Sequence, residues 1–205
     1  MGAEDKIVAR GTFCDYPESV KKIKDVGSGE LTNIEELVAV KPDVVLMSKT
    51  GFTLDQVNKM ESSGLKTLVN EANTFEDTYK YIELLGKLCG KEYEAENTVV
   101  SMKNAVVDFR ALTADKEQKT VYFQLCLPEH GYWTAGNNTF LNEMAEILNC
   151  KNVFNEVEGW AEVSREELDA RHPDFIIKID DDESFTRPGP RLIEALEKMY
   201  QIIYE

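Results

Sequence analysis

Residues 33–45 read NIEELVAVKPDVV, and residues 164–176, which begin 131 positions later, read SREELDARHPDFI. Both copies share the pattern EELxAxxPD followed by apolar residues. In each copy a residue that favours the helix N-cap, Asn33 or Ser164, precedes a short helix, and the proline ends that helix. The apolar residues that follow have the composition of a strand buried on both faces. Each copy therefore predicts a helix, a tight turn and a parallel strand, and the repeat suggests two similar lobes.

The two glutamates of each copy occupy different positions in the predicted helix. Glu36 and Glu167 lie three residues after the cap, where the carboxylate can accept a hydrogen bond from the cap's backbone N–H and complete a capping box. Glu35 and Glu166 lie one residue earlier, have no such partner, and point outward beside the positive end of the helix dipole. Complementing the dipole is a sufficient structural role for either one. Their matching positions in both copies also suggest a symmetric docking function.

Composition limits the classes of partner. The chain has 205 residues, of which 42% are hydrophobic, which is enough for the cores of two small lobes or of one large α/β domain. The net charge of −15 disfavours nucleic acid and anionic membrane surfaces as direct partners, because both are negatively charged. No apolar run reaches the length of a membrane span and no signal segment begins the chain. We expect any signal peptide or lipid-attachment cysteine to be missing from it.

The cysteines and histidines form no recognisable metal-binding motif. Four cysteines are dispersed without CxxC spacing and only two histidines are present, which disfavours zinc and favours a reducing or anaerobic setting over a disulfide scaffold. Cys126 and His130 share a predicted loop and could in principle bind a cobalt or iron centre. One thiol and one imidazole usually have no metal partner, so we expect no intrinsic metal or cofactor.

Predicted helices and strands alternate along the chain, which is typical of parallel sheets covered by helices. The first half predicts strands at 6–11, 44–47 and 65–69 and helices at 53–62 and 74–88. The second half predicts a strand at 119–125, helices at 139–148 and from 192 onward, and loops at 126–136 and 159–162 that contain the two tryptophans.

Residues 91–115 contain no proline or glycine and predict one long helix. About 25 residues, at roughly 1.5 Å each, could span a small domain. We therefore predict an N-terminal lobe (1–90), a rigid bridging helix (91–115) and a C-terminal lobe (116–205), held at a nearly fixed separation. The apolar residues that we assign to one face of this helix are Tyr93, Val99, Met102, Val106, Phe109 and Leu112.

Several segments, taken in order, resemble the substrate-binding proteins of ABC importers for vitamin B12, haem and ferric siderophores. Besides the repeat, they are GTFCDYP at 11–17, WTAG at 133–136, VSRE at 163–166 and RPGPR at 187–191. The match runs along essentially the whole chain. The resemblance implies a periplasmic-binding-protein fold of the helical-backbone type, with a ligand in the cleft between two α/β lobes. It also implies a non-enzyme in the periplasm, or a lipoprotein on the outer face of the cytoplasmic membrane.

The resemblance further implies which residues meet the ligand and the transporter. The ligand would be a metal-containing corrinoid, haem or ferric chelate, because indole faces suit a large flat molecule and cations suit its carboxylate or amide groups. Glu35 and Glu166 would dock on arginines of the two permease subunits. Tryptophan is more often a core residue and lysine is often simply solvated, so those readings stay open. The implied cleft residues are Phe13, Tyr16, Lys49, Leu125, Trp133, Trp160 and Arg187.

The chain departs from the family pattern at two places. A first strand and helix of about thirty residues would precede residue 1, and residues 180–183 stand where the family has a further helix and strand. A shortened chain can complete itself by exchanging elements with a second copy, so a homodimer of that kind is one alternative.

Two other functions also remain open. An intracellular, truncated relative could act as a sensor or interaction module, which an upstream lipoprotein signal would argue against. A doubly wound α/β enzyme is the other, but the chain has no glycine-rich phosphate loop and no GxSxG motif.

Overall fold

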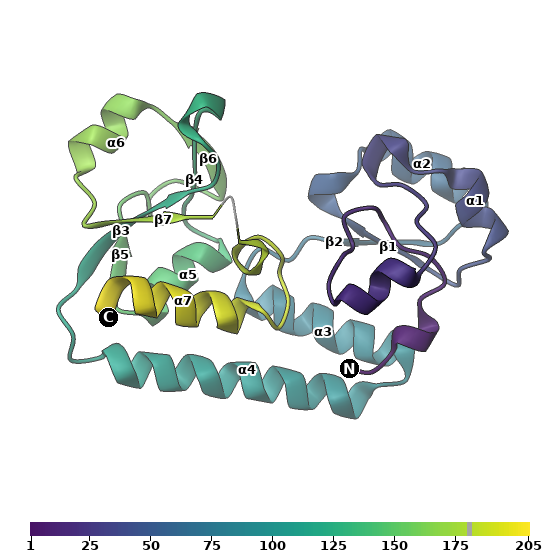
Figure 1. Ribbon diagram of the computed structural model, residues 1–205, viewed down its shortest axis with the longest axis horizontal. Helices are drawn as coiled ribbons and strands as arrows, with labels where there is room; N and C mark the ends of the chain where they lie inside the picture. The colour runs from purple at the N-terminus through teal and green to yellow at the C-terminus, as the bar shows by residue number, and fades with distance from the viewer. Residues whose placement is uncertain (180–181) are drawn as a thin grey trace. The chain divides into compact units, whose positions relative to one another are not determined.

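The computed structural model describes residues 1–179 and 182–205 (Figure 1). The chain packs into two compact units. Unit 1 comprises Met1–Glu71 and Lys87–Lys91, and unit 2 comprises Ala72–Gly86 and Glu92–Glu205. Residues 72–86, which the sequence analysis places in the N-terminal lobe, pack within unit 2. The predicted lobes and the bridging role of the helix between them stay predictions. Part of the predicted deletion at 180–183 lies outside the described residues.

Unit 1 is built on two parallel strands, β1 (Val45–Ser48) and β2 (Thr67–Asn70). The helix α1 (Ile34–Ala39) precedes β1, and α2 (Leu54–Ser62) lies between the two strands in sequence. Short 3-10 turns complete the unit: η1 (Glu4–Lys6), η2 (Glu18–Lys22), η3 (Gly29–Leu31) and η4 (Lys49–Gly51). A small core joins these elements and consists of Val26, Leu37, Met47, Met60 and Leu65.

The predicted strand at residues 6–11 is wrong. Only Arg10 pairs there, in an isolated parallel bridge to Asp25. Gly27, with a φ of 83°, turns the backbone of the partner segment immediately afterwards. An extended segment without a neighbouring strand of its own length cannot form a ladder of hydrogen bonds.

Unit 2 contains a three-stranded parallel sheet in the order β5, β3, β7 and a separate antiparallel pair, β4 with β6. The strands are β3 (Lys119–Gln124), β4 (Tyr132–Ala135), β5 (Cys150–Asn152), β6 (Trp160–Val163) and β7 (Phe175–Lys178). The helices are α3 (Phe75–Cys89), whose last turn belongs to unit 1, α4 (Glu92–Thr113), α5 (Phe140–Ile147), α6 (Arg165–Arg171) and α7 (Leu192–Tyr204), with 3-10 turns η5 (Pro128–His130) and η6 (Glu183–Phe185).

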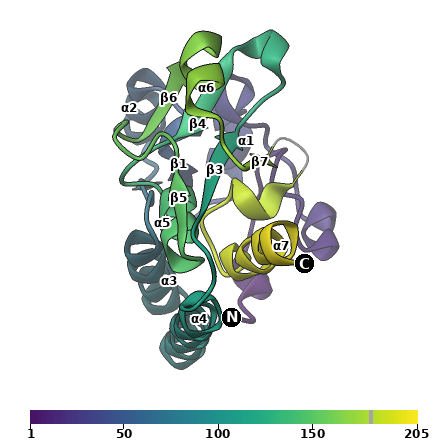
Figure 2. The ribbon, with the colours of Figure 1, turned by 90° about the vertical axis from the view of Figure 1, so that its left-hand side faces the viewer.

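The three-stranded sheet is covered on both faces. Val121 and Phe123 of β3 are fully buried in a large core shared with α3, α4, α5 and α7. Tyr122, between them, points to the other face and packs with Phe154 and Leu168, the latter from α6. Figures 1 and 2 show the corresponding layers, with α6 on one side of β3 and β7 and with α5 and α7 on the other. The predicted α/β class with helix-covered parallel strands is confirmed.

The helix α4 is unbroken, as predicted, but its buried face is not the predicted one. Tyr93 and Leu112 are 74% and 52% exposed. A helix face continues through steps of three and four residues, and the step of six from Tyr93 to Val99 leaves that face. The residues that follow the correct spacing are Ala95, Val99, Met102 and Thr113, which are buried, with Val106 and Phe109 partly buried between them.

Both copies of the repeat fold as helix, turn and strand, but the capping box is complete only in the second. Ser164 accepts a hydrogen bond from the N–H of Glu167 at 3.1 Å, and Glu167 accepts one from the N–H of Ser164 at 2.9 Å. Asn33 likewise accepts from the N–H of Glu36 at 3.1 Å. Its own N–H, however, donates to a backbone carbonyl 2.7 Å away in the preceding loop. Glu36 therefore forms an ion pair with Lys24 at 3.1 Å instead, and its predicted capping role is wrong.

The strands of the repeat are not buried on both faces, which corrects that prediction. Leu46 and Ile176 are 48% and 49% exposed, whereas Met47 and Ile177 are buried. Both β1 and β7 lie at an edge of their sheet. Successive side chains of a strand point to opposite faces, and at these edges only one face is well covered.

Within unit 2, the N-terminus of α3 is bonded to α5. The N–H of Phe75 donates to Glu143 at 2.6 Å, and the carbonyl of Asn73 accepts from the N–H of Phe140 at 2.6 Å. Burial raises the pKa of Glu143, and the nearby carboxylates of Glu146 and Asp77 add to this effect against the opposing Phe75 hydrogen bond. The carboxylate therefore joins the two helices at the cost of holding a charge in a partly buried place.

We expect Glu143→Gln to change the pH dependence of stability. Glutamine keeps an oxygen that can accept the Phe75 N–H but cannot ionise. Because the pKa of Glu143 is raised in the folded state, the stability linked to its protonated form is present below the unfolded pKa and is lost as the pH rises through the folded pKa. The melting temperature of the variant relative to the original chain should therefore increase between about pH 4 and about pH 8. Thermal unfolding followed by circular dichroism measures this, and a relative melting temperature that falls over that interval would contradict it.

Candidate functional site

Both tryptophans lie on the antiparallel ribbon formed by β4 and β6, where loops were predicted. Trp133 pairs with Glu162, and Ala135 pairs with Trp160. Directly opposite residues of an antiparallel pair share a face, as do alternate residues of one strand. Trp133 and Trp160 are therefore diagonal neighbours on one face of the ribbon, with exposed fractions of 41% and 36%. Unit 2 presents two partly exposed indoles side by side.

Glycines bound both strands of this ribbon, and they were the sequence signal for it. Gly131 and Gly136 flank β4, and Gly159 precedes β6. A Cβ on Gly136 would lie only 2.0 Å from the carbonyl oxygen of Val157, so glycine is required there for the close approach of the two segments. Short runs between such glycines favour strands over loops.

Trp160 is fixed by residues from two helix ends that sequence reasoning missed. Its indole N–H donates to the side-chain oxygen of Asn73 at 3.2 Å. Its ring meets the ring of Phe140 nearly edge-on, with 5.3 Å between centroids. Asn73 precedes α3 and Phe140 begins α5. No local pattern announces a contact between residues 87 positions apart.

Glu162 is a second residue that the sequence analysis missed. It lies across from Trp133, and a Cβ on Gly131 would be 2.5 Å from one of its carboxylate oxygens. The same Cβ would be 3.4 Å from the Trp133 ring. Glu162 is exposed and makes no hydrogen bond or ion pair within the described part of the chain. The end of the ribbon near Trp133 therefore carries an unpaired carboxylate that can accept hydrogen bonds.

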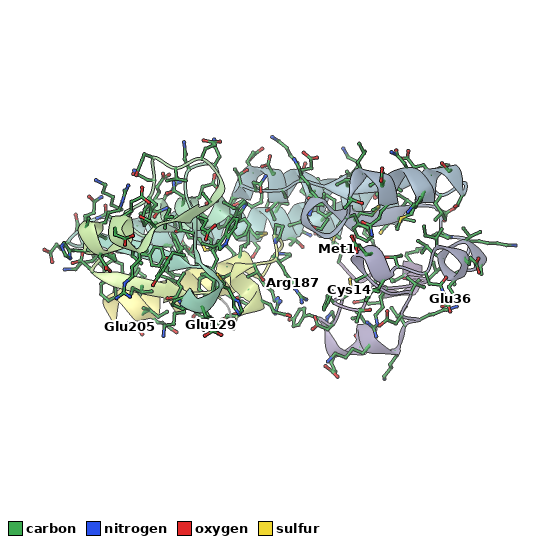
Figure 3. The ribbon with its side chains drawn as sticks, turned by 90° about the horizontal axis from the view of Figure 1, so that it is seen from above. Met1, Cys14, Glu36, Glu129, Arg187 and Glu205 are labelled. Atoms are coloured by element: carbon green, nitrogen blue, oxygen red, sulfur yellow. The ribbon has the colours of Figure 1, made fainter. Side chains whose placement is uncertain are left out.

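The other two candidates in unit 2 are engaged within the protein. The backbone N–H of Leu125 donates to the Trp133 carbonyl at 3.1 Å, and the Leu125 side chain packs against the large core. Arg187, labelled in Figure 3, forms an ion pair with Glu183, which also lies 3.6 Å from Arg191. The positive charge of Arg187 is thus balanced inside the unit.

The remaining candidates belong to unit 1. Phe13 and Tyr16 are 74% and 59% exposed, on either side of the exposed Cys14 that Figure 3 labels. Lys49 forms an ion pair with Glu71 at 3.3 Å. The predicted grouping of these residues with those of unit 2 around one ligand stays a prediction.

Metal binding and membrane insertion were also examined for the described residues. Cys126 lies 3.4 Å from the carbonyl of Gly131, and the exposed His130 lies 3.8 Å from Glu129. In residues 1–179 and 182–205, no three His, Cys, Asp or Glu side chains are placed to hold a metal ion. None of the helices in those ranges is long and apolar enough to cross a bilayer.

The two predicted docking glutamates are both exposed. Neither Glu35 nor Glu166 forms a hydrogen bond or ion pair with another described residue. Glu166 lies beside Arg165, which pairs with Asp169 at 3.4 Å. Glu35 lines a surface groove between α1 and α2, whose walls are Ile34, Glu35, Asp55, Asn58, Lys59, Ser62 and Ser63.

Sequence comparisons identify relatives along the whole chain. The family model described as periplasmic binding protein matches residues 1–190. The uncharacterized ABC transporter substrate-binding lipoprotein YvrC of Bacillus subtilis is 31% identical, over 100% of this chain and 75% of the relative. The vitamin B12-binding protein of Salmonella typhimurium is 29% identical, over 83% of this chain and 64% of the relative. The chain thus matches slightly less than two thirds of the length of that relative.

Solved structures share the fold. A protein from Staphylococcus epidermidis, described as a possible iron-binding (periplasmic solute-binding) protein, has a TM-score of 0.82 and 26% identity, covering 100% of this chain and 92% of the other. The periplasmic haem-binding protein HutB of Vibrio cholerae has a TM-score of 0.84 at 16% identity, covering 100% and 93%, a level of identity at which only the fold is comparable. These matches confirm the predicted fold and the resemblance. The chain belongs to the periplasmic binding protein family and is a substrate-binding protein of an ABC transporter, not an enzyme.

Proposed function

We propose that the chain binds a corrinoid on the indole face of the β4–β6 ribbon and delivers it to an ABC permease. The observation that carries this proposal is the pair of partly exposed indoles on one face, Trp133 and Trp160. Aromatic faces bury much area at low conformational cost and stack on large flat ligands. Trp160 is already held by Asn73 and Phe140, so little orientation is lost when a ligand arrives.

The charges support a corrinoid over haem or an anionic ferric chelate. Haem carries two carboxylates, which need unpaired cations. The two cations expected near the ligand, Lys49 and Arg187, are already paired with Glu71 and Glu183. The residue left unpaired is Glu162, a carboxylate, which repels anions but accepts hydrogen bonds from amides. A corrinoid ring carries neutral amide side chains, and the vitamin B12-binding relatives agree with this choice.

The same proposal covers location and assembly. The relative YvrC is named a lipoprotein, so we place the working protein in the periplasm or on the outer face of the cytoplasmic membrane, held there by a lipid anchor on a segment outside this sequence. A homodimer formed by exchanged elements is the alternative assembly, and light scattering of the purified chain distinguishes it from a monomer.

Replacing either tryptophan should weaken corrinoid binding. We expect Trp133→Leu and Trp160→Leu each to raise the Kd for cyanocobalamin about tenfold, because each removes one stacking face of the order of 1 kcal/mol or more. Isothermal titration calorimetry measures the Kd, with haem and a ferric catecholate chelate as the competing ligands. Tyr93→Leu, an exposed aromatic on α4, is the control and should leave the Kd unchanged. Tighter binding of haem than of cyanocobalamin, or unchanged affinity in both tryptophan variants, would refute the ligand assignment.

We also propose that Glu35 and Glu166 dock on arginines of the two permease subunits. The double variant Glu35→Lys/Glu166→Lys should abolish uptake into proteoliposomes that contain the permease while ligand affinity stays intact. The matched control reverses two other exposed, unpaired carboxylates, one in each unit, with Asp43→Lys/Glu197→Lys. Loss of ligand affinity in the first double variant, or uptake equal to that of the control, would count against the docking assignment.

A further inference from the structure

The two copies of the repeat differ in what stands beside the free glutamate. In unit 1, β1 is followed by α2, and α2 forms one wall of the groove that Glu35 lines. In unit 2, β7 is followed by residues outside the described ranges and then by η6 and α7. Figure 1 shows α7 on the side of β7 opposite α6, and the residues Leu192, Leu196 and Met199 of α7 are fully buried in the large core. In the described part of unit 2, α6 thus lacks the partner helix that α1 has.

The matched stretch of YvrC agrees with a shortened second copy. That alignment extends over 237 residues and includes all 205 residues of this chain. About 32 positions of it therefore have no counterpart here, a length that corresponds to the helix and strand expected after β7. Loss of that helix would remove from unit 2 the element that corresponds to α2.

The groove of unit 1 has the chemistry to bind a guanidinium group. Glu35 of α1 and Asp55 of α2 both line it, and neither forms an ion pair or hydrogen bond with another described residue. Asn58 adds an amide oxygen, and Ile34 an apolar surface on which a planar cation can lie. Lys59, also without a recorded partner, keeps the groove near a single net negative charge. One arginine side chain therefore satisfies the groove, and a second would not be balanced.

The corresponding surface of unit 2 offers less. Arg165 is paired with Asp169, and Glu167 is used in the capping box. In the described residues of α6 this leaves Glu166 as the one carboxylate free to face a partner. A single ion pair on an exposed helix is weak because solvent screens it, whereas two carboxylates around one guanidinium give directed, charge-assisted hydrogen bonds.

We propose that docking on the permease is unequal: the α1–α2 groove takes an arginine-bearing segment of one permease subunit between Glu35 and Asp55 and supplies most of the affinity. Glu166 adds only one weak contact with the other subunit. This inference rests on the proposed function, in which Glu35 and Glu166 face the permease, and adds Asp55 as a residue that determines docking.

Single, charge-removing variants of the full chain test this inequality against the permease reconstituted in nanodiscs. By biolayer interferometry we expect Glu35→Gln and Asp55→Asn each to raise the Kd about tenfold, and Glu166→Gln about twofold or less. The double variant Glu35→Gln/Asp55→Asn should be weaker than wild type by less than the product of the single effects, since both carboxylates hold one group. Asp43→Asn and Glu197→Gln are matched controls, and every variant should keep its corrinoid affinity.

The outcomes separate the two claims. An effect of Glu166→Gln as large as that of Glu35→Gln, or an Asp55→Asn variant that behaves like Asp43→Asn, overturns the unequal docking while leaving the proposed function in place. A wild-type chain that does not bind the permease, or binding that is indifferent to Glu35, Glu166 and Asp55 together, overturns both.

Discussion

The antiparallel register of β4 and β6 is the constraint on which the functional account depends. It sets Trp133 opposite Glu162 and Trp160 opposite Ala135, which places both indoles on one face. A shift of one residue in this register would move one indole to the other face, because side chains alternate along a strand. Gly136 protects the register, since the backbone of Val157 leaves no room for a side chain there. The ligand surface is thus specified by backbone pairing before any ligand is present.

Internal ion pairs decide which ligands this surface suits. Lys49 and Arg187 are the cations that a haem carboxylate would need, and each is already bonded to a glutamate. Breaking such a pair to bind an anion leaves a carboxylate unpaired and returns little net energy. Glu162 remains available beside Trp133. A neutral ligand with amide groups can bind without disturbing any of these pairs.

The sequence predicted what local patterns control and missed what distant contacts control. Caps and proline turns located α1, β1, α6 and β7 correctly, because these signals act within a few residues. The same reasoning failed for Glu36, whose cap N–H is bonded to a carbonyl of another loop, and for residues 6–11, which have no partner strand. Both tryptophans were identified as candidates, but Asn73 and Glu162 were not. Their roles arise only when α3 and the ribbon pack together within unit 2.

The most direct test is an NMR titration of the two indole N–H groups. The chain contains only two tryptophans, so a ¹⁵N-labelled sample gives one indole signal from each. Upon addition of cyanocobalamin, we expect both signals to shift or broaden together and to saturate at the same ligand concentration. Calorimetry on the same sample shows whether the ligand is bound. Binding that leaves either indole signal unchanged would contradict an account in which Trp133 and Trp160 form one ligand face.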